Sequence, residues 1–242
     1  MRSPEELAGV LRGLGYDVAE VLPFELDAPL SNGTRPYVAF EWIGERNYLK
    51  ETSGGRVAGD TGRQRGANFT SLDFAMRFRQ NDGRIHIIAG EWKYTEEYAR
   101  DKSIRHSKAG KDRLEIYRPS LDMPDCQITL QGVTAEALFF DPFDQLMRQQ
   151  LLASAMERES EMDADIVSLL HIAPKANGEL MNRITSPALA GLGDDIHAVW
   201  SKLIPPGRFR GFYTERLLKL VVENPPSADW ANWVGQRYGG VR

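Results

Sequence analysis

A pair of apolar segments around Asn81-Asp82-Gly83 constrains the fold of this chain more than any other feature of its sequence. Residues 70–79 and 84–93 have the composition of strands, and the tripeptide between them is typical of a turn. A three-residue hairpin loop needs a glycine in the left-handed conformation, and Gly83 is suited to that position. This loop pairs Gln80 with Arg84 and predicts the register of the whole hairpin.

In this register Asp73 lies directly across from Glu91, and Ser71 lies across from Lys93. All four side chains share one face, because residues two apart on a strand project the same way. The opposite face is mostly apolar and able to pack on a helix; it consists of Leu72, Phe74, Met76, Phe78, His86, Ile88, Gly90 and Trp92. A two-residue loop at Asp82-Gly83 remains open, and it would place Asp73 opposite Trp92, on the wrong face.

Two opposed carboxylates repel each other unless a cation lies between them, and carboxylate oxygens are suited to a hard ion such as Mg²⁺. Lys93 beside them can orient or deprotonate an attacking water and neutralise charge that develops on a phosphate. The pattern of Asp73, Glu91 and Lys93 therefore favours hydrolysis of a phosphodiester. The competing interpretation is a surface salt bridge of Lys93 with either carboxylate, which would have no function.

Two segments carry a resemblance to a known family: RGANFTSLD at residues 65–73 and GEWKYTE at residues 90–96. They resemble the PD-(D/E)xK nuclease superfamily, in particular its restriction-endonuclease-like bacterial members. The resemblance implies an α/β fold with a restriction-endonuclease-like core, a mixed central sheet flanked by helices. It also implies that Asp73, Glu91 and Lys93 are the catalytic residues, although Leu72 stands where the superfamily often has proline.

A strong helix is expected from Asp141 onward, with apolar residues spaced by four along one side. It is similar to the glutamine-bearing helix that follows the catalytic strands in several branches of the superfamily. The resemblance implies a catalytic role for Gln145, which with Gln149 one turn later could hold a water or a phosphate at the metal. Arg148 is expected to contact nucleic acid. An ordinary polar helix face is the alternative.

The resemblance further implies an acidic residue on the first core helix, which we expect over residues 37–51. Glu41 and Glu45 lie four apart on one face of that helix, and the sequence does not separate them. We select Glu45 as the third metal ligand, beside Asp73 and Glu91. The expected cofactor is Mg²⁺, with Mn²⁺ as a substitute.

We expect one domain over residues 1–242. Its nuclease core spans approximately residues 37–174, with an N-terminal helical segment at 1–36 and a C-terminal helical extension at 175–242. Ile166–Ala173 is a continuous apolar run, as expected of a strand buried on both faces. Helices are expected near residues 3–15, 194–203 and 214–223.

The formal net charge of -4 argues against a protein that coats nucleic acid through a uniformly basic surface. Residues 100–118, however, carry seven basic side chains against three acidic ones. The residues expected to contact phosphates are Arg65 in a glycine-rich loop, Arg105, Lys108, Lys111 and Arg148.

Several classes of protein lack support. Cys126 is the single cysteine, so neither an internal disulfide nor a cysteine-based zinc site is possible. Phosphate-loop, dinucleotide-binding and serine-hydrolase motifs are absent from the sequence. We expect His171 to be a core histidine with a hydrogen-bond partner. No apolar run is long enough to span a membrane and no signal peptide is recognisable, so we expect a cytoplasmic protein without a membrane partner.

The leading hypothesis is an endonuclease that acts on DNA. The sequence leaves open whether RNA is also a substrate and whether the protein forms a homodimer. A second hypothesis is a catalytically inactive nucleic-acid-binding or partner-docking module of the same fold. A third is a phosphohydrolase acting on small molecules.

Overall fold

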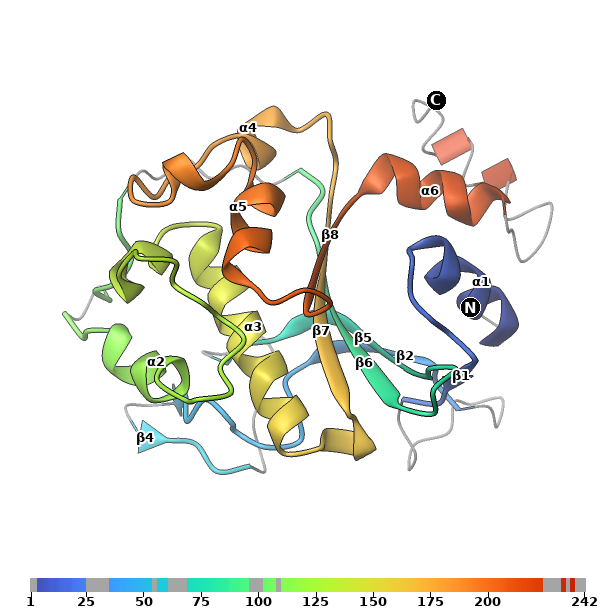
Figure 1. Cartoon of the computed structure of the whole chain (residues 1–242), viewed down its shortest axis with the longest axis horizontal. Coiled ribbons are helices and arrows are strands. Elements are labelled where there is room, and N and C mark those ends of the chain that lie inside the picture. The colour runs from blue at the N-terminus through green and yellow to red at the C-terminus, as the bar shows by residue number, and fades with distance from the viewer. Residues whose placement is uncertain are drawn as a thin grey trace.

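A computed structural model describes residues 4–24, 35–53, 56–60, 69–95, 102–107, 110–223, 232–233 and 236–237. Within these ranges a six-stranded sheet forms the centre, and helices cover both of its faces (Figure 1). The strands of this sheet are β1 (Glu20–Leu22), β2 (Val38–Trp42), β5 (Leu72–Arg79), β6 (Ile85–Trp92), β7 (Ile166–Ala173) and β8 (Phe209–Tyr213). A separate two-stranded ribbon consists of β3 (Thr52–Ser53) and β4 (Arg56–Val57).

The sheet is mixed, as expected from the sequence. Strands β1, β5, β6, β7 and β8 follow one another in that order, and β2 also pairs with β5. The pairings of β5 with β1, β2 and β6 are antiparallel, whereas β6, β7 and β8 are parallel. Because β1 and β8 lie outside residues 37–174, the sheet also includes parts of the two flanking segments expected to be helical.

The β5–β6 hairpin has the register that the three-residue loop predicts. Gln80 donates its N–H to the Arg84 carbonyl at 2.8 Å, and Gly83 adopts a φ of 89°. The paired residues run from Arg79 with Ile85 to Phe74 with Gly90. The pairing ends one residue short of Asp73 and Glu91, where the Trp92 N–H donates to the Asp73 side chain.

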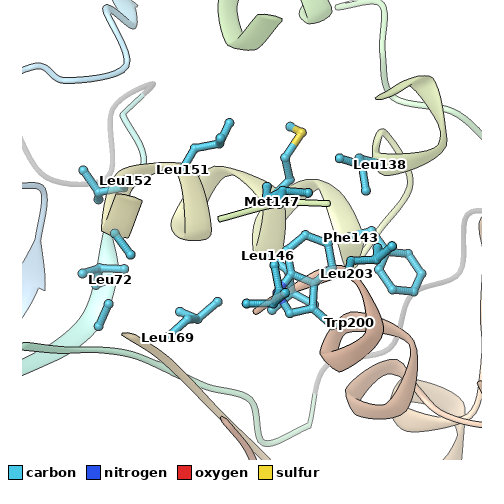
Figure 2. Packing of buried hydrophobic residues seen from close by; sticks show 14 of the residues in the cluster. Leu72, Leu138, Phe143, Leu146, Met147, Leu151, Leu152, Leu169, Trp200 and Leu203 are labelled. Atoms are coloured by element: carbon cyan, nitrogen blue, oxygen red, sulfur yellow. The ribbon is translucent and has the colours of Figure 1, made fainter. Parts of the chain in front are cut away.

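Helix α3 (Phe143–Arg158) lies along one face of the sheet, together with α2 (Leu114–Leu121) and α5 (Ile196–Leu203) (Figure 1). In Figure 2, Leu146 of α3 lies near Leu169 of β7, while Phe143 lies beside Trp200 of α5. All four side chains are buried, and burial of each large apolar side chain contributes roughly 1.5–3 kcal/mol. This packing fixes α3 over the face that carries Glu91. Leu72 packs on this face too, and not on the opposite face that the sequence predicted for it.

Helices α1 (Pro4–Gly13) and α6 (Thr214–Glu223) cover the other face (Figure 1). They pack with Met76, Phe78 and Ile88 in a second apolar cluster. The remaining short helices are α4 (Gly178–Met181) and the 3-10 turns η1 (Ala135–Leu138), η2 (Glu161–Asp163) and η3 (Ala190–Leu192).

The helix expected over residues 37–51 is wrong. Val38–Trp42 forms strand β2, which pairs with β5 through Ala39 and Ala75, and an irregular segment follows it. The β-branched and aromatic residues of this stretch fit a strand, and the free edge of β5 supplies hydrogen-bonding partners that a helix would leave unused. Glu41 has a positive φ of 53° within β2.

We expect Gly90→Ala to destabilise the protein by about 1–3 kcal/mol, because a Cβ at Gly90 would lie 2.1 Å from Cε2 of Phe74 across the hairpin. The penalty should shrink in a Phe74→Ala background, since the two positions are coupled. Urea unfolding of both single variants and the double variant measures this coupling. Gly191→Ala is the matched control, because a Cβ there meets nothing within 4 Å. Equal costs for Gly90→Ala and Gly191→Ala would contradict the register.

Candidate active site

Asp73 and Glu91 meet where β5 begins and β6 ends. The backbone N–H of Trp92 donates to Oδ2 of Asp73 at 2.8 Å, which anchors this carboxylate across the two strands. Glu91 is only 1% exposed, whereas Asp73 is half-buried. Lys93 follows β6, and its N–H donates to the carbonyl of Ile172 in the neighbouring strand at 2.8 Å. Backbone N–H groups at the end of β6 thus hold Asp73 and the backbone of Lys93 in place.

The side chain of Lys93 turns back onto Glu91. Its Nζ lies 2.5 Å from Oε1 of Glu91, and the ammonium group is itself largely buried, at 12% side-chain exposure. A surface salt bridge is therefore excluded for this pair, because both charges are shielded from water. The structure brings Asp73, Glu91 and Lys93 together as the sequence predicts.

Helix α3 contributes two amides to the same carboxylate. Gln145 donates from Nε2 to Oε1 of Glu91 at 2.6 Å, and Gln149 donates to Oε2. Gln149 also donates to the carbonyl of Ser71 at 3.3 Å. Residues four apart share one face of a helix, which explains why both glutamines reach Glu91. Each oxygen of the buried carboxylate therefore accepts at least one hydrogen bond.

Burial raises the pKa of the Glu91 carboxyl, because the charged form loses its hydration. The Lys93 ammonium opposes this effect and lowers the pKa, while the neighbouring Asp73 carboxylate raises it again. Two carboxyl groups thus share a confined region with one cation. A divalent cation would relieve their repulsion.

The donor set fits such an ion. Asp73 and Glu91 supply carboxylate oxygens, the ligands that Mg²⁺ prefers. Oε1 of Gln149 is buried and has no hydrogen-bond partner among the described residues, so a polar oxygen beside Glu91 still needs a partner. The described part of the chain contains no group of three or more His, Cys, Asp or Glu side chains placed to hold a metal. A metal ion here would therefore be bound by two carboxylates, and other oxygen ligands would complete its coordination.

Glu45 is not brought together with the other two carboxylates. It lies exposed in the irregular segment after β2, and its backbone N–H donates to Oε2 of Glu161 at 3.0 Å. The loss of the expected helix explains this placement, since β2 carries the chain along β5. Glu41, the alternative, is also exposed.

The basic residues expected at nucleic acid have varied surroundings. Arg105 is paired with Asp112, whose Oδ1 lies 2.9 Å from its Nε, and with Glu136. Lys111 is exposed. Arg65 and Lys108 lie outside the described residues.

Arg148 lies beside the site and not on the open surface. Its Nε is 3.4 Å from Oδ2 of Asp144, which also accepts from Arg113 at 2.9 Å. Asp144 is buried, so these two guanidinium groups compensate its charge. Arg148 therefore already has a partner within the protein.

Sequence reasoning missed Glu51. This residue is 5% exposed and accepts hydrogen bonds from the N–H and hydroxyl of Thr70 at 2.7 and 2.6 Å and from the Tyr117 hydroxyl at 3.0 Å. It thereby ties the residues that precede β5 to helix α2. The sequence carries no signal for this contact, because the partners are 19 and 66 residues away.

His171 has the hydrogen-bond partner expected of a core histidine. It lies opposite Glu91 on β7, and its Nδ1 is 2.9 Å from Nε2 of His197 on α5. Burial lowers the pKa of both imidazoles, that of His197 to about 4, so the pair is neutral at neutral pH. A Cβ at Gly211 would lie 2.3 Å from Cγ of His197, so glycine there makes room for the pair.

A mixed sheet with an Asp on one strand, Glu-x-Lys on the next and helices on both faces defines a restriction-endonuclease-like fold. The sequence model of the family described as "Restriction Endonuclease associating with ARP" matches residues 23–239, and the chain belongs to this family. No curated protein and no solved structure matches the chain significantly. Among the described helices, none combines the length and apolar character needed to cross a membrane.

We expect Lys93→Met to lower the free energy of unfolding by about 3 kcal/mol at pH 8 and by less at pH 5. The pKa of Glu91 is raised in the folded protein, so the folded chain keeps this proton to higher pH than the unfolded chain, where the pKa is 4.5. The contribution of this group to stability is therefore lost as the pH rises above 4.5, and removal of Lys93 increases that loss.

Urea unfolding at the two pH values measures the effect. Lys219→Met on α6, where the side chain is 75% exposed, is the matched control and should change little. A loss of equal size at pH 5 and pH 8 would show that Glu91 and Lys93 do not interact as the structure implies.

Proposed function

We propose that the chain is a divalent-metal-dependent endonuclease that hydrolyses phosphodiester bonds in DNA. The observation that carries this proposal is the buried Glu91 carboxylate, set opposite Asp73 and held by Lys93, Gln145 and Gln149. The family to which the chain belongs is described as a restriction endonuclease family, which supports a nuclease.

Asp73 and Glu91 would hold Mg²⁺, or Mn²⁺ in its place. The bound ion would supply Lewis-acid polarisation of a phosphoryl oxygen. The Lys93 side chain would lie next to the reacting phosphate, where its positive charge would offset the negative charge that develops there. It can also orient the attacking water through its N–H groups. The two glutamines fix the orientation of Glu91, as outer hydrogen-bond partners of metal ligands commonly do.

Among the expected phosphate contacts that the structure describes, Lys111 is the exposed cation, and we propose that it touches the DNA backbone. RNA is the alternative substrate, and a homodimer that cuts both strands is the candidate assembly. We also propose a cytoplasmic location. The family description also names an association with ARP, and hydrolysis at this site does not depend on it.

Asp73→Asn should lower the rate of DNA cleavage by at least about 100-fold, because it removes a ligand charge and still lets the side-chain oxygen accept from Trp92. Lys93→Met should do the same. The assay uses supercoiled plasmid, single-stranded DNA and RNA with Mg²⁺ or Mn²⁺, under conditions where circular dichroism shows each variant folded. Lys219→Met is the control and should cleave like the unchanged protein.

Metal-dependent cleavage that survives both substitutions would refute the assigned site. Salt-sensitive DNA binding without cleavage of any substrate would instead favour a catalytically inactive nucleic-acid-binding module. Release of phosphate from nucleotides alone would favour a small-molecule phosphohydrolase.

Gln145→Leu should weaken Mn²⁺ binding by about 10–100-fold, because it removes a hydrogen bond to Oε1 of Glu91 and leaves Asp73 untouched. Isothermal titration calorimetry without nucleic acid measures this affinity separately from activity. Gln131→Leu, an exposed glutamine outside the site, is the matched control. Unchanged Mn²⁺ affinity in Gln145→Leu would show that the α3 amide does not support a metal ligand.

A further inference from the structure

A polar hollow of about 350 Å³ opens at the end of the sheet opposite the candidate active site. It lies where β6 and β7 begin and where the segment after α1 crosses them. The polar residues of its lining include Tyr16, Arg84, His86, Ser168, Arg208 and Arg210.

This hollow is separate from the candidate active site. His86 lies near the start of β6 and Glu91 near its end, five residues further along. At a rise of roughly 3.3 Å per residue, the two positions are about 17 Å apart along the strand. The inference drawn from the hollow therefore does not rest on the proposed nuclease activity.

The Tyr16 hydroxyl is a buried polar group without a partner. Tyr16 is 8% exposed, and its hydroxyl makes no hydrogen bond of good geometry to any described residue, although Ser168 and Arg210 lie close to it. Burial raises the pKa of Tyr16 to about 12, so the group is a neutral O–H donor. Buried polar groups of this kind usually have a partner, and Tyr16 is one of the residues that line the hollow.

Three guanidinium groups line the same hollow. Arg210 is held in place by the carbonyls of Leu14 and Gly15, at 2.7 and 3.2 Å, and its Cζ lies 4.7 Å from the centre of the Tyr16 ring. Gly15 has a φ of 88°, and a Cβ there would lie 2.5 Å from Nη1 of Arg210, so this glycine admits the guanidinium. Arg210 is thus a fixed cation beside the Tyr16 hydroxyl.

The other two arginines reach the hollow from either side. Arg208 is 2.9 Å from Oε1 of Glu157, and Arg84 pairs with Asp82 at the exposed hairpin turn, at 2.7 Å. Asp17 is the acidic residue of the lining. Arg84 and Arg208 are each paired with a carboxylate, whereas Arg210 donates to backbone carbonyls and keeps its positive charge beside the hollow. This charge favours a ligand with negative charge, and each guanidinium has further N–H donors to present to an anion.

His86 and Ser168 form the floor. Gln80 lies 3.1 Å from Nδ1 of His86, and Nε2 of His86 lies 2.7 Å from the Ser168 hydroxyl. Burial, together with the positive charges of Arg208, Arg210 and Arg84, lowers the pKa of His86 to about 3. The floor is therefore neutral and offers hydroxyl and imidazole groups, while the positive charge comes from the arginines around it.

We propose that this hollow binds a small phosphate monoester, with Arg84, Arg208 and Arg210 around the phosphate and the Tyr16 hydroxyl donating to one of its oxygens. Guanidinium groups bind phosphate through charge-assisted, often bidentate hydrogen bonds. The volume lies at the lower end of the range for small-molecule sites and exceeds what a bare phosphate fills. Ile166 is the aliphatic residue of the lining and can contact the organic part of the ligand.

Isothermal titration calorimetry of the full chain with adenosine monophosphate, inorganic phosphate and adenosine tests the proposal. We expect the two phosphates to bind with one-to-one stoichiometry and adenosine not to bind. Tighter binding of adenosine monophosphate identifies a nucleotide-like ligand, and equal binding of the two identifies phosphate itself as the ligand. Absence of binding of both phosphates at millimolar concentration overturns the proposal.

Two variants locate the binding. Arg84→Gln removes an exposed charge of the lining and should weaken adenosine monophosphate about tenfold. Tyr16→Phe should also weaken it and should change the thermal midpoint little, because the hydroxyl makes no hydrogen bond of good geometry to any described residue. Arg46→Gln removes an exposed arginine outside the lining and is the matched control. Binding that neither Arg84→Gln nor Tyr16→Phe alters overturns the assignment.

A DNA-binding measurement distinguishes the proposed pocket from a surface that contacts nucleic acid. If Arg84→Gln weakens DNA binding while adenosine monophosphate does not bind the unchanged protein, the arginines contact the nucleic-acid backbone and the proposed pocket is refuted.

Discussion

The register of the β5–β6 hairpin is the constraint on which the rest of the structure depends. Gly83 turns the chain with a positive φ, and the pairs that follow set Phe74 against Gly90 on one face. Glu91 then lies on the face under α3. A slip of one residue would exchange the two faces, burying apolar side chains where the charged ones now lie. The geometry of one turn thus decides both the packing and the position of the carboxylates.

Helix α3 both packs in the apolar core and supplies hydrogen bonds to Glu91. Its leucines and Phe143 pack on the sheet and on α5, while Gln145 and Gln149 donate to Glu91. Burial of a carboxylate is costly unless hydrogen bonds and an opposite charge compensate it. Lys93 and the two glutamines provide that compensation. The apolar packing of α3 therefore also positions the two amides, whose hydrogen bonds compensate the free-energy cost of burying Glu91.

The two ends of the central strands differ in charge. The end of β6 that carries Glu91 is acidic, with Lys93 as its counter-ion, and the beginning of the same strand faces Arg208 and Arg210 on the chain after α5. Parallel strands bring side chains from distant segments to the same edge of the sheet. The proposed metal site and the proposed phosphate site would thus lie at opposite ends of the same strands.

The sequence by itself determined the elements whose signal is local. The turn at Gly83, the buried strand Ile166–Ala173, the helix that carries Gln145 and Gln149, and the register of the hairpin from Phe74 to Arg79 all follow from spacing and residue type. In each of them the hydrophobic period or the turn chemistry agrees with the final structure, so local preference and tertiary packing favour the same conformation.

Only the tertiary structure decided the contacts between distant segments. Residues 38–42 became a strand because the edge of β5 offered hydrogen bonds, which moved Glu45 away from the expected helical face. Glu51 accepts a hydrogen bond from Tyr117, and His171 lies within hydrogen-bonding distance of His197. Arg210 lies over the ring of Tyr16, which is far away in the sequence. Such contacts depend on how the helices and strands pack, and no spacing along the chain encodes them, because partners far apart in sequence are selected by shape, charge and burial in three dimensions.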